Sequence, residues 1–171
     1  QVTFSYLGGN DDYWWAVDNV AVRAPFSQVA EEPNTVIDVI SDPQDDPEDY
    51  KLAIRRLNAM PEKASALVIN GDLVDNGSQE QWDKFLAARK EAPHDSGVEL
   101  WTIGNHEMYG KESSEVHMQR FLKYSGQDKP WNEVVVDGTP LISINTEYYS
   151  DVDRDGKEPF QRISAEQLKW L

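Results

Sequence analysis

The chain has 171 residues, a formal net charge of −15 and no cysteine. The excess of acidic side chains argues against a protein that binds nucleic-acid phosphates or anionic membranes through lysine and arginine. The absence of cysteine excludes disulfide scaffolds, thiolate zinc sites and cysteine nucleophiles. With 39% hydrophobic residues and six tryptophans, the sequence predicts a folded domain. No apolar run approaches the length of about 20 residues that a membrane helix needs.

Residues 1–23 predict a β-hairpin whose second strand, 13–22, is rich in aromatic and β-branched side chains. This strand resembles the closing strand of jelly-roll modules attached to exported bacterial enzymes, and residues 24–34 are interpreted as a linker. We favour core or interface packing for Trp14 and Trp15 over a carbohydrate-binding role, which stays open. The hairpin and the acidic composition lead us to expect an extracellular or cell-surface bacterial protein.

From residue 35 onward the pattern alternates between strands and helices. Strands are predicted at 36–41, 66–69, 98–103, 133–136 and 141–144, with a turn at 137–140. Helices are predicted at 47–60, after the cap Asp46, and after the caps Ser78, Ser113 or Ser114, and Ser164. Ser164 with Gln167 also predicts a capping box. The alternation favours βαβ units, which form a sheet with helices on its faces.

Polar clusters follow each of the first three predicted strands directly, at 41–44, 70–77 and 104–107. Because the carboxyl ends of parallel strands meet at one edge of a sheet, these clusters should converge. Their carboxylate, carboxamide and imidazole groups suit a manganese or transition-metal site. Each cluster taken singly is also typical of an ordinary turn, and only their equivalent positions favour the metal interpretation.

The segments 71–75, Gly-Asp-Leu-Val-Asp, and 104–107, Gly-Asn-His-Glu, resemble two sequence blocks of the calcineurin-like metallophosphoesterases. Residues 40–44 resemble the family's first block, Asp-x-His, with Gln44 at the histidine position. The resemblance covers about residues 35–171. It implies that the chain is the N-terminal part of an α/β sandwich with helices on both faces of its sheet. It also implies that the substrates are phosphomonoesters or phosphodiesters, which are hydrolysed.

The resemblance further implies two divalent metal ions. Asp42 would bind the first ion, Asp72 would bridge the two ions, and Asn105 would bind the second through its amide oxygen. At these positions we expect Mn, Zn, Fe or Ni. Gln44 would take the place of a histidine ligand, and because its amide oxygen is a hard ligand, Mn²⁺, Mg²⁺ or Ca²⁺ is expected there.

The same resemblance makes His106 the catalytic residue, which would protonate the leaving oxygen or stabilise the transition state. Asp75 and Glu107 would orient the metal-binding loops. In the purple acid phosphatases a metal-binding tyrosine stands at the position of Asp75. The aspartate therefore argues against a tyrosinate–iron centre.

The family supplies further histidine ligands from Gly-His and Gly-His-x-His blocks, and these blocks are absent from this sequence, which ends at Leu171. We expect His94 in a loop and His117 on the surface or on one face of a helix, so that neither replaces those ligands. The chain would then hold about half of a two-metal site. We expect it to need the remainder of a longer parent chain and to show little activity alone.

Two other functions compete with the enzyme. The domain could be a non-catalytic binding or scaffold protein with a degenerate metal site, an interpretation that Gln44 favours. Alternatively, the main function could belong to a surface-binding module of which residues 1–23 are a part. Residues 151–156 resemble the start of a calcium loop, but Arg162 stands at its twelfth position, so we favour an acidic solvated turn over a lone Ca²⁺ site, which stays open.

Overall fold

The computed structural model describes residues 35–44, 46–147 and 163–171. Thr35–Leu171 forms one compact unit. The hairpin and linker predicted for residues 1–34 and the acidic turn predicted at 151–156 lie outside the described residues, so they stay predictions.

Three parallel strands form the sheet on which the polar clusters are placed. The strands β1 (Ile37–Ile40), β2 (Ala66–Asn70) and β3 (Glu99–Thr102) lie in the order β1-β2-β3. We call the end of the sheet that carries residues 41–44, 70–77 and 104–107 the carboxyl edge, and the end that carries Asp38 and residues 94–99 the amino edge. The parallel pairing confirms the predicted α/β class and brings the three polar loops to one edge.

Three helices begin at N-caps that the sequence predicts. The helices α1 (Pro47–Asn58), α2 (Gln79–Glu91) and α3 (Ser114–Ser125) follow Asp46, Ser78 and Ser113, and each cap side chain accepts a backbone N–H from the first turn of its helix. Of the two serines proposed for α3, the structure selects Ser113. These local hydrogen bonds satisfy backbone donors that the helix itself leaves without partners.

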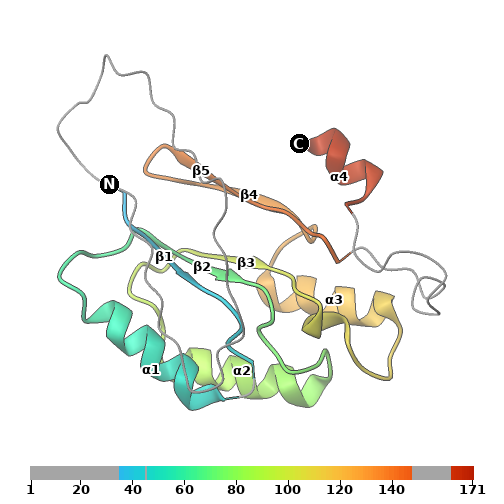
Figure 1. Cartoon of the computed structure of the whole chain (residues 1–171), viewed down its shortest axis with the longest axis horizontal. Helices are drawn as coiled ribbons and strands as arrows, with labels where there is room; N and C mark the ends of the chain where they lie inside the picture. Colours follow the sequence, from blue (N-terminus) through green and yellow to red (C-terminus); the bar gives the residue numbers. More distant parts are fainter. Residues whose placement is uncertain (1–34, 45, 148–162) are drawn as a thin grey trace. The chain divides into compact units, whose positions relative to one another are not determined.

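The core lies between these helices and one face of the sheet, as Figure 1 shows. Trp82 of α2 is fully buried, and its ring stacks on Trp101 of β3 with 6.4 Å between the centroids. Ile54 of α1 and Phe121 of α3 are also fully buried in this cluster. Burying each such side chain contributes about 2 kcal/mol, so the carboxyl edge extends from a firmly packed base.

A hairpin of β4 (Asn132–Val136) and β5 (Thr139–Ser143) lies on the other side of the sheet, and β5 contacts β3. Its turn is shorter than the predicted 137–140: only Asp137 and Gly138 connect the strands, with φ values of 50° and 77°. Two residues of positive φ give a turn whose twist suits a hairpin. Pro140, which was predicted in the turn, lies in β5 opposite Val135.

The last described helix, α4 (Ala165–Trp170), begins after Ser164, whose hydroxyl accepts the Gln167 N–H over 3.1 Å. Only this half of the predicted capping box forms. The Gln167 side chain turns to Asn145 instead, accepting its N–H and donating to its carbonyl, both over 2.8 Å. None of the described helices is long and apolar enough to cross a membrane.

Candidate metal centre at the carboxyl edge

Two predicted metal ligands, Asp42 and Asp72, follow β1 and β2 at the carboxyl edge. Their φ values of 54° and 51° lie in the left-handed region, which residues other than glycine rarely adopt. The pKa of the Asp72 carboxyl is raised, chiefly by burial and further by the neighbouring Asp42 carboxylate. Close carboxylates on a strained backbone are typical of a functional site that holds a cation.

Gln44 ties the loops that carry these two carboxylates. With its amide assigned so that the nitrogen faces acceptors, Nε2 donates to Asp72 O over 2.7 Å and to Asp42 O over 3.0 Å. The backbone N–H of Gln44 also donates to Asp72 O, over 3.2 Å. The amide oxygen is therefore the end of this side chain that can bind a metal ion.

Asn105 and His106 reach the same edge from the loop after β3, where His106–Met108 forms a short 3-10 helix, η1. His106 N donates to Asp72 Oδ1 over 3.0 Å, and His106 Nδ1 lies 2.7 Å from Asp75 O. Because a carbonyl oxygen can only accept, Nδ1 carries the hydrogen of this bond. Nε2 is then the ring nitrogen that can take up or release a proton.

Glu107 is fully buried and binds backbone groups from both polar loops. Its Oε2 accepts from Asp72 N and Gly104 N, over 3.1 and 2.6 Å. Its Oε1 accepts from Leu73 N and Val74 N, over 2.6 and 3.2 Å. Burial raises the pKa of Glu107 to about 7, and its N–H donors oppose that rise. The side chain fixes the loop after β2 to the loop after β3.

Glycines let these two loops approach closely. A Cβ atom at Gly104 would overlap Asp72 Oδ1 and lie 2.5 Å from Asp72 N. A Cβ atom at Gly71, where φ is +81°, would lie 3.2 Å from the Gly104 Cα. A side chain at position 104 would therefore displace the Asp72 carboxylate directly.

The residues at the carboxyl edge fit a hard divalent cation, because they offer carboxylate and amide oxygens. The fit is partial within the described residues, where no group of three or more His, Cys, Asp and Glu side chains is placed to hold a metal ion. The structure brings Asp42 and Asp72 together and places Asn105 and His106 in the adjacent loop. The two amides, at Gln44 and Asn105, would have to supply further ligand oxygens.

The other histidines of the described chain lie away from these carboxylates. His94 is in a loop, as predicted, and its Nε2 lies 2.9 Å from Asp38 Oδ2 at the amino edge. His117 was predicted on the surface or on a helix face, but it is only 1% exposed. Its Nδ1 lies 3.2 Å from Gly77 O, because α3 packs against the loop before α2.

Tyr109 is the residue at this site that the motifs do not reveal. Its hydroxyl accepts a hydrogen bond from Asn105 Nδ2 over 2.6 Å, and its ring lies 4.9 Å from the His106 ring. A signal was present in the sequence, since Tyr109 follows Asn105 by four residues, the spacing of side chains that meet across one helical turn.

Comparison with known proteins agrees with the motifs. Residues 35–171 match the family model of the calcineurin-like phosphoesterases. No curated protein matches the chain at a significant level. The matched residues include the whole sheet, the three polar loops and the helices that support them.

Proposed function

The chain belongs to the calcineurin-like phosphoesterase family, and from this membership we propose that its carboxyl edge hydrolyses phosphomonoesters or phosphodiesters with two divalent ions. At the level of the family, the chain is a phosphoester hydrolase. Asp42 and Asp72 hold the first ion in this proposal, and Asp72 and Asn105 hold the second. When bound, the ions supply Lewis acidity to the phosphoryl group and a nucleophile at neutral pH.

The observation that carries the proposal is the pairing of Asp42 with Asp72. Each carboxylate costs the other electrostatic free energy, and the raised pKa of Asp72 reflects both its burial and this repulsion. The strained φ values of both residues add a conformational cost. A divalent cation between the carboxylates would offset the repulsion, which explains why the fold keeps such an arrangement.

His106 is the proposed proton donor. The carbonyl of Asp75 holds its Nδ1–H over 2.7 Å, and the ring is thereby fixed in one tautomer. Nε2 can give a proton to the leaving oxygen of the ester only after it has itself taken one up, so His106 would act as an imidazolium whose Nδ1–H stays on the Asp75 carbonyl. Asp75 therefore acts through its backbone carbonyl, and Glu107 acts by fixing the loops that carry Asp72 and Asn105.

The identity of the ions follows from the ligand types. Gln44 can offer only its amide oxygen, since its nitrogen donates to the carbonyls of Asp42 and Asp72. We therefore propose Mn²⁺, Mg²⁺ or Ca²⁺ at the position beside Gln44, with Mn, Zn, Fe or Ni at the other.

The test measures metal binding and turnover separately. Mn²⁺ binding is followed by the electron paramagnetic resonance signal of the free ion. Turnover of p-nitrophenyl phosphate and bis(p-nitrophenyl) phosphate is measured on the proposed full-length parent protein, because the chain alone is expected to show little activity. Asp72→Asn should lower Mn²⁺ affinity by roughly tenfold or more. His106→Ala should leave Mn²⁺ binding unchanged and lower kcat by about 100-fold or more.

Asp83→Asn is the matched control, since Asp83 is an exposed carboxylate on α2 that bonds Gln79 Nε2. It should change neither measurement. An absence of Mn²⁺-dependent turnover in the wild-type parent protein, together with an Mn²⁺ affinity that Asp72→Asn does not alter, would contradict the proposal.

A second candidate is a non-catalytic binding protein that kept the fold and part of the metal site. The engagement of the Gln44 amide with two backbone carbonyls favours it, because a loop-bridging role would explain the glutamine without catalysis. Mn²⁺ binding with no turnover of either ester by the wild-type parent protein would support this candidate over the enzyme.

A further inference from the structure

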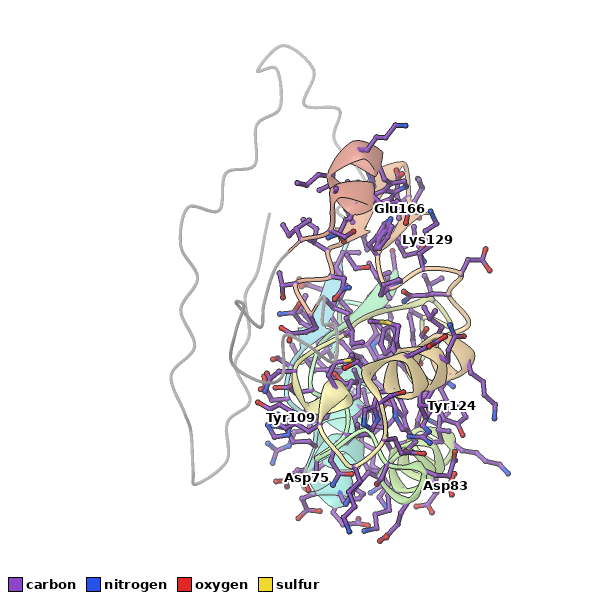
Figure 2. All side chains as sticks on the ribbon, turned by 90° about the vertical axis from the view of Figure 1, so that its right-hand side faces the viewer. Asp75, Asp83, Tyr109, Tyr124, Lys129 and Glu166 are labelled. Carbon is purple, nitrogen blue, oxygen red and sulfur yellow. The ribbon has the colours of Figure 1, made fainter. Side chains whose placement is uncertain are left out.

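Tyr109 contacts both Asn105, the proposed metal ligand, and His106, the proposed proton donor. It follows η1 directly and is 46% exposed. Its hydroxyl accepts from Asn105 Nδ2 over 2.6 Å, and its ring lies 4.9 Å from that of His106 at an interplanar angle of 46°. Figure 2 labels Tyr109 on the η1 side of the molecule, away from Tyr124 of α3.

The backbone of Tyr109 is fixed by hydrogen bonds on both sides. Its N–H donates to His106 O over 3.1 Å, and its carbonyl accepts from Gly77 N over 2.8 Å. The Gly77 carbonyl in turn accepts from Arg120 of α3, and Arg120 pairs with Glu112 through two nitrogen–oxygen contacts of 2.7 and 3.0 Å. The exposed ring therefore extends from a segment that the rest of the fold holds in place.

The amide of Asn105 has two different ends, and only its oxygen can bind a cation. When the Tyr109 hydroxyl accepts a hydrogen bond from Asn105 Nδ2, the amide nitrogen is occupied and the amide oxygen, Oδ1, is left for a cation. We propose that Tyr109 is a positioning residue, whose hydroxyl holds Asn105 Nδ2 so that Oδ1 is the end offered to a divalent ion, while its ring limits the motion of His106. This inference rests on the proposed function, because it assigns Asn105 to the metal.

A purely structural role for Tyr109 predicts different results. Almost half of the surface of Tyr109 is exposed, so the side chain adds little to the core. In a purely structural role, removing its hydroxyl would change the stability of the fold or have no effect. A positioning role predicts instead that removing the hydroxyl changes the environment of the Asn105 amide and the affinity for the metal ion, with the stability of the fold unchanged.

The chain offers a matched control in Tyr124. Its hydroxyl also accepts from a side-chain amide, Gln79 Nε2, over the same distance of 2.6 Å. Gln79 starts α2 and Tyr124 lies on α3, so this bond involves neither the carboxylates nor η1. Tyr109→Phe and Tyr124→Phe thus delete the same chemical group from the same kind of hydrogen bond at two different places.

The experiment records the side-chain amide signals of Asn105 in ¹H–¹⁵N spectra of the full chain, and Mn²⁺ affinity by electron paramagnetic resonance. Tyr109→Phe should shift the Asn105 signals and weaken Mn²⁺ binding by about tenfold, the usual effect of losing a group that orients a ligand. Tyr124→Phe should shift the Gln79 signals and change Mn²⁺ affinity less than twofold. The urea midpoint should be the same in both variants and the wild type.

Unchanged Asn105 signals in Tyr109→Phe would overturn the inference, and so would a Mn²⁺ affinity equal to that of Tyr124→Phe. Failure of the proposed function has another signature, which is that the wild-type protein itself binds no Mn²⁺. In that case the Asn105 signals alone decide the orienting role: a shift confined to Tyr109→Phe supports it, and no shift overturns it.

Discussion

The two ends of the β1–β3 sheet differ in the groups that contact their acidic side chains. At the amino edge each carboxylate has an oppositely charged or hydrogen-donating side chain beside it. Asp38 lies 2.9 Å from His94 Nε2, and Glu99 accepts from Arg89 Nε and Trp101 Nε1, both over 2.8 Å. These contacts offset the cost of removing carboxylates from water, so this end contributes to the stability of the fold.

At the carboxyl edge the carboxylates meet each other, backbone N–H groups or neutral side chains: Ser41 Oγ donates to Asp42 Oδ2, and Asn76 Nδ2 donates to Asp75 Oδ2 over 3.5 Å. None of the ion pairs within residues 35–44, 46–147 and 163–171 includes Asp42, Asp72 or Glu107. Glu107 is satisfied by four backbone N–H groups, and Asp72 by the N–H of His106. Under the proposed function, this difference means that one end of a single sheet contributes to stability, while the other would accept a positively charged ligand at a cost in stability.

The largest expected effect comes from Glu107→Gln, which alters the carboxyl edge without changing its shape. The amide keeps one acceptor oxygen, so either the Asp72 and Gly104 pair of N–H groups or the Leu73 and Val74 pair loses its acceptor. Two buried donors without partners should lower the free energy of unfolding by about 3 kcal/mol, measured by urea denaturation.

Glu99→Gln is the comparison at the amino edge, where one remaining oxygen can still accept from Arg89 or Trp101. Its cost should be about 1 kcal/mol. If Glu107→Gln and Glu99→Gln lowered the free energy of unfolding equally, the proposed difference would be wrong. Glu107, which joins two loops, would then matter no more for stability than Glu99, which binds two side chains.

His94→Ala should have the next largest effect, and it tests the amino edge alone. The substitution leaves Asp38 and Ser96 without the ring that bonds both, and should cost about 2 kcal/mol of unfolding free energy. Mn²⁺ affinity should stay within twofold of wild type, because His94 is at the opposite end of the strands. Asp95→Asn, an exposed change in the same turn, should alter neither quantity, and a loss of Mn²⁺ binding in His94→Ala would contradict the separation of the two edges.

Tyr50→Phe should have the smallest effect and the opposite sign. The Tyr50 hydroxyl is buried and has no hydrogen-bond partner among the described residues, so its removal should stabilise the protein by about 1 kcal/mol. Burial raises the pKa of Tyr50 above its ordinary value of 10. The unfolded chain therefore loses this proton first as the pH rises, and the free energy of unfolding of the wild type falls above pH 10.

The advantage of Tyr50→Phe should accordingly widen between about pH 10 and 11, measured by urea denaturation at each pH. Tyr124→Phe removes a hydroxyl that accepts from Gln79, and it should leave the free energy of unfolding unchanged. A Tyr50→Phe variant less stable than wild type at pH 7 would show that the hydroxyl is satisfied in solution.

Local patterns predicted much of this fold, because caps and strand periodicity depend on neighbouring residues. Asp46, Ser78 and Ser164 cap the helices that they were expected to cap. The convergence of three loops at one edge followed from parallel strand order, which the alternating pattern indicates. Ser113 could not be separated from Ser114 by sequence, since both are serines, a residue type that is favoured at N-caps.

The contacts that the sequence could not predict join segments far apart in the chain. The nitrogen of Gln44 bonds the carbonyl of Asp72, and the ring of His117 meets Gly77. Tyr109 bonds Asn105 within one turn, but its importance depends on where Asn105 lies relative to Asp72. The Gln44 and His117 contacts follow from packing, and no periodicity or short motif encodes them.

The Gln167–Asn145 contact has a consequence for the choice of amino acid at position 167. The Gln167 side chain accepts from the backbone N–H of Asn145 and donates to its carbonyl, so it satisfies both backbone groups of that residue, as the backbone of an adjacent strand would. Glutamate would lack the donor, methionine would lack both groups, and asparagine would be one methylene shorter. These two hydrogen bonds therefore restrict substitution at this buried position, and a residue outside the polar loops should be as intolerant of exchange as those within them.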